Sequence, residues 1–547
     1  MENSPNRISR FLRLAFWALV LCSILAIVLL VMEWDQFVHT LPGGGGNFQA
    51  VRIVILVFVN FLFTIVLVTI GLLYLWGRLA KSLPELHGWH LQRPKSEFTA
   101  SDATDNYTFD DYLKQEEKVF DELHALITGP WTTQQPGAYS RYHQDSVCNP
   151  ATIVDRNWNR SHVLEAAEPA GGVLLLHGLS DSAYSLRALG QRLHKEGYTV
   201  IWMRIPGHGT CPGALANVSC RDWSAAVRVA MKGLRDRLPE DCPLFIAGYS
   251  NGGALSVHYA LSAVKDKTLP QLKGLLLFSP MLGINPMARI TRLYHTVALV
   301  SRNLKAQWSN IDAEVDPFKY SSWPMNASVQ AWSMTQEVER QLAQIEKSGR
   351  MQEFPPVVAM QSIVDSTVVV PKLITTLFDR LRSKSSELFL FDINRVDKLG
   401  NLLNRSFEQK LIPRLKRTDL PYRLTILKNI QADSHQVAAH TRDGKSWTET
   451  ATGMSWPQET ISLSHIAVPI PPEDPVYGTR EATADTGLSL GTVSMRAEPS
   501  ALLISNSLFV RCRHNPFYGH MENHIVQWLS NNNPSPNSGA APKAAAP

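Results

Sequence analysis

The sequence predicts an α/β protein with a mostly parallel sheet that helices cover on both faces. Apolar runs of strand length recur along the centre of the chain, at 171–178, 198–209, 243–250, 272–280, 355–365 and 386–392. They lack the polar alternation of a half-exposed strand, which is typical of strands buried on both faces. Amphipathic stretches separate the first four runs, at 182–197, 222–238 and 251–264. In such a sheet we expect functional side chains on the loops past the carboxyl ends of the strands.

The overall composition is that of a globular protein. The chain has 547 residues, of which 45% are hydrophobic and 18% are charged, so it can form one large domain with additional segments. Its net charge of +5 is the difference between 53 basic and 48 acidic residues. No concentrated basic run is present, so nucleic acid is not expected as a partner. The sequence does not indicate an oligomeric state.

Two long apolar segments occupy the N-terminal region. They lie at 14–32 and 53–76, about 19 and 24 residues long, and each is sufficient for a hydrocarbon core of roughly 30 Å. We therefore predict a transmembrane helical hairpin over 1–80. A cleaved signal peptide is the alternative for the first segment, but it is long, lacks a small-residue cleavage site and is followed by the second segment.

The charges around the two segments predict their orientation. Basic residues lie outside the hairpin, at Arg7, Arg10, Arg13, Arg78 and Lys81. The loop between the segments carries Glu33 and Asp35 with only one arginine. Positive residues favour the cytoplasmic side, so we expect a multi-pass protein of the inner (cytoplasmic) membrane with its main domain in the cytoplasm. The six cysteines form no CxxC pair, and Cys211 and Cys220 would pair only in an oxidising compartment.

The stretch GYSNG, from Gly248 to Gly252, carries the strongest chemical signal. It fits the G-x-S-x-G pattern, in which a serine lies at a tight turn between a strand and a helix. An apolar run precedes Ser250 and a helical stretch follows it, as that geometry requires. We therefore predict that Ser250 is a nucleophile, and that the following helix directs its N-terminus at the developing anion.

A second strand end lies about seventy residues earlier in the chain. His177 and Gly178 end the apolar run of LLLHGLSDS. An oxyanion needs two converging backbone donors, and we predict the amides of Leu179 and of Asn251, the residue after the nucleophile. On this interpretation His177 has a structural role.

These motifs together resemble the α/β-hydrolase superfamily. The stretches HGLSDSAYSLRALGQRL, RIPGHGT, GYSNGG and SIVDSTVVVP are similar to the bacterial monoacylglycerol lipase, lysophospholipase and serine aminopeptidase-like branch. The resemblance is good over 171–374 and loose beyond it. It implies the α/β-hydrolase fold with a cap insertion, a structural role for His208, and a serine, histidine and aspartate triad.

The resemblance also indicates the acid. In that branch the acid follows a late strand, and Asp365 occupies the equivalent position after VVAMQSIV. A carboxylate there would fix the tautomer of the histidine and stabilise its protonated form. Asp392, at the end of the next run, is the rival, and helix capping is the alternative role of Asp365.

The histidine is the least certain member because the family position after 386–392 has none. This departure indicates an insertion, over about 393–455. His465 ends the alternating run ETISLSHI and precedes a proline-rich loop, so we predict that a strand gives way there to a loop of the site. His465 also preserves the chain order of the triad. His435 is the second choice, and the other candidates are His440, His514, His520 and His524.

The remaining boundaries follow from these assignments. We predict a linker and N-terminal arm at 81–150 with a helix at 108–127, an α/β-hydrolase domain at 151–530, and a disordered tail at 531–547. The resemblance implies a cap over an acyl pocket at about 281–354, with a purely structural insertion as the alternative. Cys512 and the nearby histidines fit no familiar zinc spacing, so we expect no metal and no organic cofactor.

Together these features predict a membrane-anchored serine hydrolase of carboxylic esters. A lysophospholipid, a monoacylglycerol or a similar lipid ester is the expected substrate, largely by analogy. A peptidase or a thioesterase would use the same triad. A catalytically silent membrane scaffold is the alternative of another class, and the histidine missing from the family position favours it.

Overall fold

The computed structural model describes most of the chain, and its described residues form two compact units. They are 47–128, 137–283, 303–365, 367–368, 370–395, 411, 413–415, 417, 419–431, 433–458, 460–494 and 510–533. The first unit comprises 47–83 with 303–306, and the second comprises the other described residues.

The first unit consists mainly of one long helix, α2 (Asn47–Lys81). Large apolar side chains are exposed along it, among them Val57, Phe61 and Leu72. Near its C-terminal end Ala80 is buried with Ala306, and the indole of Trp76 donates to the Ala306 carbonyl at 3.3 Å. These contacts tie the end of α2 to a segment more than two hundred residues away in sequence.

The predicted membrane hairpin receives no support from the described residues. The first predicted span, 14–32, lies outside them, and the second, 53–76, lies within α2. In the described part of the chain, no helix combines the length and the apolar character needed to cross a membrane.

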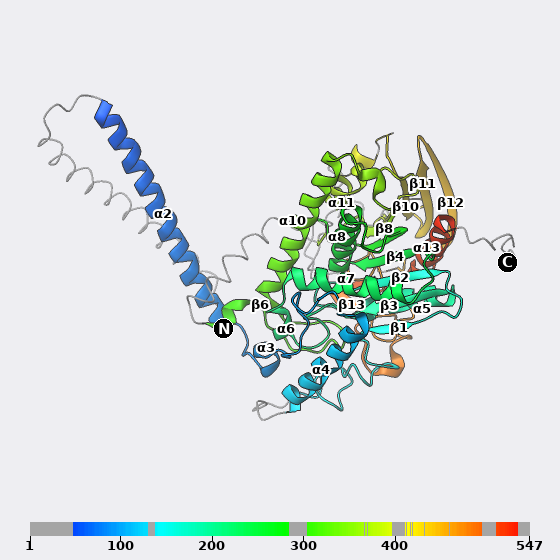
Figure 1. The fold of residues 1–547 in the computed structure, drawn as a ribbon, viewed down its shortest axis with the longest axis horizontal. Coiled ribbons are helices and arrows are strands. Elements are labelled where there is room, and N and C mark those ends of the chain that lie inside the picture. The colour runs from blue at the N-terminus through cyan, green and yellow to red at the C-terminus, as the bar shows by residue number, and fades with distance from the viewer. Residues whose placement is uncertain are drawn as a thin grey trace, which may run out of the picture. The chain divides into compact units, whose positions relative to one another are not determined.

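The second unit is built on a ten-stranded sheet in the order β1-β3-β2-β4-β5-β8-β9-β10-β11-β12 (Figure 1). The strands from β3 to β10 pair in parallel, whereas β1, β11 and β12 pair antiparallel. The predicted mostly parallel sheet is therefore confirmed. The strands are β1 (His162–Leu164), β2 (Gly171–Leu176), β3 (Tyr198–Met203), β4 (Leu244–Tyr249), β5 (Gly274–Phe278), β8 (Val357–Ser362), β9 (Glu387–Phe391), β10 (Arg423–Asn429), β11 (Gln436–Asp443) and β12 (Ser446–Ser455).

Helices cover both faces of this sheet. One face packs against α7 (Cys220–Asp236), α8 (Asn251–Lys265), α10 (Met325–Lys347) and α11 (Val370–Thr376). The other face packs against α5 (Arg187–Lys195) and α13 (Tyr518–Asn532). Every residue of β2, β3, β4, β5, β8 and β9 is buried. This burial on both faces explains why the apolar runs show no alternation.

Close packing of α5 on the sheet depends on a glycine. A Cβ atom added to Gly190 would lie 2.3 Å from Cζ2 of Trp202 and 2.4 Å from Cδ1 of Leu175. Neither neighbour is at the flexible end of a surface chain, since both side chains are buried in strands. Glycine at this position lets the helix approach the sheet.

The predicted insertion at 393–455 extends the sheet beyond β9. Its described residues add β10 in parallel and then the antiparallel strands β11 and β12. Both faces of β10 contribute to the core, since Leu424 and Leu427 are inaccessible to solvent and pack into different clusters, while β12 is largely exposed along its length. The domain therefore continues well past the strands that the apolar runs indicate.

The predicted arm at 81–150 packs into the core. Its main helix, α4 (Phe109–Thr128), buries Phe109, Tyr112 and Val119. The Tyr112 hydroxyl donates to the Arg204 carbonyl at 2.6 Å, just beyond β3. Shorter elements complete the unit: α3 (Gly88–Leu91), α6 (Pro212–Leu215), β6 (Trp308–Asn310), β7 (Trp323–Pro324), β13 (Thr492–Ser494) and β14 (Val510–Cys512).

Candidate active site

Ser250 occupies a strained turn between β4 and α8. Its backbone angles are φ 53° and ψ −111°, a region that residues other than glycine rarely adopt. Two backbone hydrogen bonds fix the turn: the Ser250 amide donates to the Phe278 carbonyl at 2.9 Å, and the Met281 amide donates to the Ser250 carbonyl at 2.9 Å. The turn is thereby held against the end of β5.

The two glycines of the motif are required by space. A Cβ atom on Gly248 would lie 2.4 Å from the Gly252 carbonyl oxygen, and one on Gly252 would lie 2.1 Å from the Leu176 carbonyl oxygen. Both contacts are shorter than any tolerated approach of a carbon to an oxygen. The pattern G-x-S-x-G thus has a direct steric cause in this chain.

The structure brings Ser250 and His465 together. Nε2 of His465 lies 3.0 Å from Oγ of Ser250, within hydrogen-bond distance. Both residues are buried, with exposed fractions of 7% for Ser250 and 8% for His465. The ring of Tyr249 lies beside the imidazole, with the ring centres 5.4 Å apart. His465 can therefore accept the serine proton if Nδ1 carries the ring hydrogen.

Asp365 completes the arrangement on the other side of the imidazole. Its Oδ2 accepts from Nδ1 of His465 at 2.7 Å. Its Oδ1 accepts from the amides of Thr367 and Val368, each at 2.9 Å. These hydrogen bonds orient the carboxylate, which in turn selects the tautomer that leaves Nε2 free to act as a base.

The two predicted oxyanion donors are available. In the described part of the chain, the amides of Leu179 and Asn251 make no hydrogen bond. Asn251 begins α8 directly after the nucleophile, and Leu179 follows β2, whose neighbour in the sheet is β4. A further bond, from the Gly252 amide to the His177 carbonyl at 3.0 Å, connects the two segments.

His177 holds the ends of two strands together. Its Nε2 accepts from the Ile205 amide at 3.0 Å, and its Nδ1 lies 2.9 Å from the Gly178 carbonyl. Burial lowers the pKa of His177 well below its ordinary value, and the adjacent His208 contributes. Burial likewise lowers the pKa of His208 to about 3. Both rings are therefore neutral at physiological pH.

The prediction that a strand leads into His465 is wrong. Residues 460–466 form turns and bends without any strand pairing. The alternating apolar residues Ile461 and Leu463 are buried because the segment packs as a loop. The Asn394 amide donates to the Ile461 carbonyl at 2.7 Å, and the Ser464 hydroxyl donates to the Cys512 carbonyl at 3.2 Å. The alternation of apolar residues that resembles a strand therefore reflects the burial of this loop.

The other candidate histidines lie elsewhere. Nδ1 of His435 contacts the side-chain amide of Asn394 at 3.2 Å. His440 lies on β11 opposite Glu449. Nδ1 of His514 lies 3.3 Å from the Tyr477 carbonyl. His520 and His524 lie on α13, where His524 faces the carboxylate of Glu387 at 3.2 Å.

The rival acid also has another partner. Asp392 forms an ion pair with Arg395, with Oδ2 lying 2.6 Å from Nε. Its Oδ1 accepts from the Ile393 amide at 2.8 Å. These interactions occupy both oxygens of Asp392, whereas Asp365 contacts the histidine.

Part of the predicted cap reaches the oxyanion segment. The Tyr320 amide donates to the Ser180 carbonyl at 2.9 Å. Lys319 pairs with Asp181 at 3.2 Å, and the ring of Phe318 stacks on Tyr184 with the ring centres 3.9 Å apart. Residues 284–302 of the cap lie outside the described residues, and α10 packs against α8.

Two buried polar groups near the site carry no obvious sequence signal. Asp474 accepts from the Tyr184 hydroxyl at 2.9 Å, which ties the loop after His465 to the segment after β2. Arg513 pairs with Asp316 at 2.8 Å, and Tyr477 also donates to Asp316. Burial opposes ionisation of Asp316, but Arg513 and the hydrogen bonds outweigh it and lower the pKa of this carboxyl.

A small cavity lies beside the candidate triad. Its volume is about 20 Å³, and its lining includes Tyr249, Ile466, Lys319 and Arg513, which is room for about one water molecule. In the described part of the chain, no group of three or more histidine, cysteine, aspartate or glutamate side chains could hold a metal ion. Cys211 and Cys220 are free thiols.

Comparison with known proteins adds sequence support to this geometry. The sequence profile of the family described as serine aminopeptidase, S33, matches residues 167–392. This range contains the turn at Ser250, the segment after β2 and Asp365. The chain has the α/β-hydrolase fold. His465 lies beyond the matched range.

Two curated relatives share part of the same region. The thermostable monoacylglycerol lipase of Bacillus sp. (strain H-257) is 36% identical over 104 residues, which are 18% of this chain and 40% of the lipase. Phospholipase YtpA of Bacillus subtilis (strain 168) is 26% identical over 120 residues, 22% of this chain and 44% of the phospholipase. The chain thus spans less than half the length of each relative.

A solved structure is similar over a larger share of this chain than either of these two relatives. The monoacylglycerol lipase of Paleococcus ferrophilus is 20% identical, with a TM-score of 0.32, and the alignment covers 42% of this chain and 88% of that lipase.

Proposed function

We propose that this protein is a serine hydrolase that cleaves carboxylic esters of lipid-like molecules through Ser250, His465 and Asp365. The observation that carries the proposal is the continuous chain of contacts from Ser250 to His465 at 3.0 Å and from His465 to Asp365 at 2.7 Å. Since these residues come from three distant parts of the sequence, their meeting supports an assembled nucleophile. The similarity to a monoacylglycerol lipase and a phospholipase favours a lipid ester as the substrate class.

The proposed reaction has two halves. Oγ of Ser250 attacks the ester carbonyl carbon while Nε2 of His465 accepts its proton, and the amides of Leu179 and Asn251 donate to the oxyanion. Collapse of the intermediate breaks the bond to the leaving alcohol, which takes the proton from Nε2. A water molecule then attacks the acyl-enzyme and gives its proton to His465. The carboxylic acid leaves as Oγ recovers that proton.

A peptidase is the second candidate. The description of the matched family as a serine aminopeptidase favours it, and the same geometry would serve amide hydrolysis. A thioesterase would need no further residue either. The silent scaffold is favoured by the histidine missing from the family position, whereas the contact of His465 with Ser250 at 3.0 Å supports catalysis.

Fluorophosphonate labelling of the full-length protein in mild detergent tests the proposal. We expect the wild type to label, and Ser250→Ala and His465→Ala to remain unlabelled, while His435→Ala labels like the wild type. A wild type that is folded but does not label would overturn the assignment of the nucleophile. Rates on monoacylglycerols, lysophospholipids, thioesters and aminoacyl anilides then separate the lipid ester from the other substrate classes.

We also propose that the protein works at the inner membrane, and that the second compact unit, built on the ten-stranded sheet and called the hydrolase unit from this point, lies in the cytoplasm. The flanking positive charges and the exposed apolar side chains of α2 support this location. Flotation of cell membranes in a density gradient followed by carbonate extraction tests the attachment. A C-terminal reporter tests the side, and recovery of the full-length protein free in the cytoplasm would contradict the proposal.

A further inference from the structure

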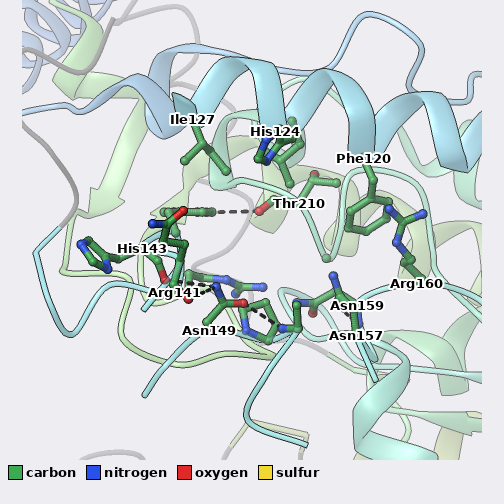
Figure 2. A pocket seen from close by; sticks show the side chains of 16 residues that line it. Phe120, His124, Ile127, Arg141, His143, Asn149, Asn157, Asn159, Arg160 and Thr210 are labelled. Carbon is green, nitrogen blue, oxygen red and sulfur yellow. Dashed lines mark hydrogen bonds between the residues drawn. The ribbon is translucent and has the colours of Figure 1, made fainter. Parts of the chain in front are cut away.

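A second cavity in the hydrolase unit has an unusual lining. Its volume is about 550 Å³, which is within the range of small-molecule sites. It lies between α4, the segment 141–160 and the loop after β3 (Figure 2). Among the residues that the structure describes, its lining includes the arginines Arg141 and Arg160 and the histidines His124 and His143, and it includes no aspartate or glutamate. None of them belongs to the candidate triad.

Among the lining residues, Arg141 has the most unusual environment. Only 3% of this residue is exposed, and within the described part of the chain its guanidinium makes no hydrogen bond and no ion pair. Its Nη1 is both buried and unpartnered. Arginine carries its charge in all ordinary protein environments, and a buried charge without a partner is costly. Such a group indicates a ligand that would complete it.

The carboxylate of Glu314 interacts with the charge of Arg141, but its hydrogen bonds go to other groups. The Glu314 carboxylate accepts from the amides of Ser321 and Ser322, at 3.0 Å and 2.8 Å. Burial raises the pKa of Glu314 in spite of the charge of Arg141. The Arg141 guanidinium also lies over the faces of two rings, 5.8 Å from the centre of Tyr142 and 5.5 Å from the centre of Tyr320. Rings compensate a charge only partly.

The cavity also has an apolar side. Phe120, Leu123 and Ile127 lie on α4 at positions separated by three and four residues, so they share one face of the helix. Arg160 lies over the ring of Phe120 at 4.1 Å from its centre. Figure 2 shows Arg160 beside Phe120, on the side of the cavity opposite Arg141. A ligand there would meet the buried guanidinium of Arg141 at one end and hydrocarbon along α4, with Arg160 beyond Phe120 at the far side.

We propose that this cavity is a binding site for an amphiphilic acid, with a carboxylate or phosphate head group on Arg141 and an alkyl chain along α4. The planar guanidinium suits both head groups because it can donate two parallel hydrogen bonds. The buried and unpartnered Oδ1 of Asn159 would accept from a hydroxyl of the head group or from a water molecule. The site is separate from the proposed catalytic centre and does not depend on it.

Calorimetric titration of the full-length protein in non-ionic detergent tests the site. The probes are octanoate, octyl phosphate, octanol and butyrate, each with a blank titration into detergent alone. We expect at least one octyl acid to bind the wild type and Ser250→Ala alike, and octanol and butyrate to bind at least about tenfold more weakly. The stronger of the two octyl acids distinguishes a free acid from a phosphate-bearing lipid.

Variants of the arginine give the decisive readout. Arg141→Met should weaken binding of the octyl acid by at least about tenfold, whereas the exposed Arg382→Met should leave it unchanged. Without ligand, Arg141→Met should melt at the same temperature as the wild type or higher, because it removes an unpaired buried charge. A structural arginine would instead lower the melting temperature.

Several outcomes would overturn the site. They are the absence of binding by every probe, equal binding of octanol and the octyl acids, and unchanged binding by Arg141→Met. Ile127→Ser, at a half-buried position on the apolar side, provides an independent variant that keeps the arginine. It should weaken octanoate more than butyrate, and equal effects on the two acids would contradict the proposed position of the chain.

Discussion

The hydrolase unit has two parts that contribute to the site in different ways. The region up to β9, which matches the family profile, supplies the proposed nucleophile Ser250, the proposed acid Asp365 and the two proposed oxyanion amides from turns at the ends of buried parallel strands. The region after β9 supplies only His465, from a loop that follows three additional strands. The first part therefore positions its groups locally, whereas the second positions one side chain through long-range packing.

The largest expected effect tests whether both parts act as one catalytic unit. Ser250→Ala and His465→Ala should each reduce kcat for ester hydrolysis by about 10⁶-fold, and the double variant should be no worse than either. Steady-state rates on a soluble ester measure this. Ser262→Ala, on the same helix as the nucleophile turn, is the control and should keep full activity. Additive losses would mean that the two residues do not act on the same step.

The acid should give the next largest effect. Asp365→Asn should reduce kcat by about 10⁴-fold, because an amide cannot stabilise the protonated imidazole or hold the required tautomer. Asp392→Asn is the matched control, and hydrolysis by this variant should stay near the wild-type rate. A loss confined to Asp392→Asn would transfer the acid to the end of β9.

The added strands can be compared with the core by stability. Leu427→Ala removes a fully buried side chain of β10 and should lower the free energy of unfolding by about 2–5 kcal/mol. Trp447→Thr, on the largely exposed strand β12, should change it by no more than about 0.5 kcal/mol. Urea denaturation of the two variants measures both. A small effect of Leu427→Ala would indicate that β10 to β12 unfold apart from the rest.

The smallest predicted effect concerns acid stability. Because burial lowers the pKa of His208 to about 3, the folded state resists a proton that the unfolded chain accepts below its ordinary pKa of 6.5. His208 therefore makes folding progressively less favourable as the pH falls from 6.5 toward 3, by about 2 kcal/mol at pH 5. Denaturation at pH 7 and pH 5 should show a smaller loss in His208→Gln than in the wild type.

A histidine from the added strands provides the comparison. His440 lies on β11 and is only half-buried, and its pKa is lowered by burial and by Lys428. His440→Gln should therefore relieve less of the acid sensitivity than His208→Gln does. An equal gain in both variants would show that the acid response does not depend on how deeply the ring is buried.

The sequence predicted the first part of the unit well because its signals are local. An apolar run, a small-residue turn and a helical stretch place Ser250 within a few neighbouring residues, and Gly248 and Gly252 are required by the same turn. Asp365 was assigned from the resemblance to the family, and it too lies shortly after a buried strand.

The sequence did not predict the structure of the second part, the region after β9, in the same way. The alternation before His465 predicted a strand, but it comes from loop residues whose burial depends on distant segments. Strand β12 carries no apolar face that a pattern could reveal, since nearly all of it is exposed. The unpartnered Arg141 has no sequence signal, because a missing partner is visible only when the surrounding chain has folded.

The long separation between Ser250 and His465 has a consequence for biosynthesis. The two residues are 215 positions apart, so at ordinary translation rates the histidine is made roughly 10 to 40 s after the serine. During that interval the nascent chain has its nucleophile turn but no base to activate it. By the proposed mechanism, a chain that is still bound to the ribosome therefore cannot hydrolyse lipid esters. Hydrolysis begins only when the C-terminal part has been synthesised and has folded onto the sheet.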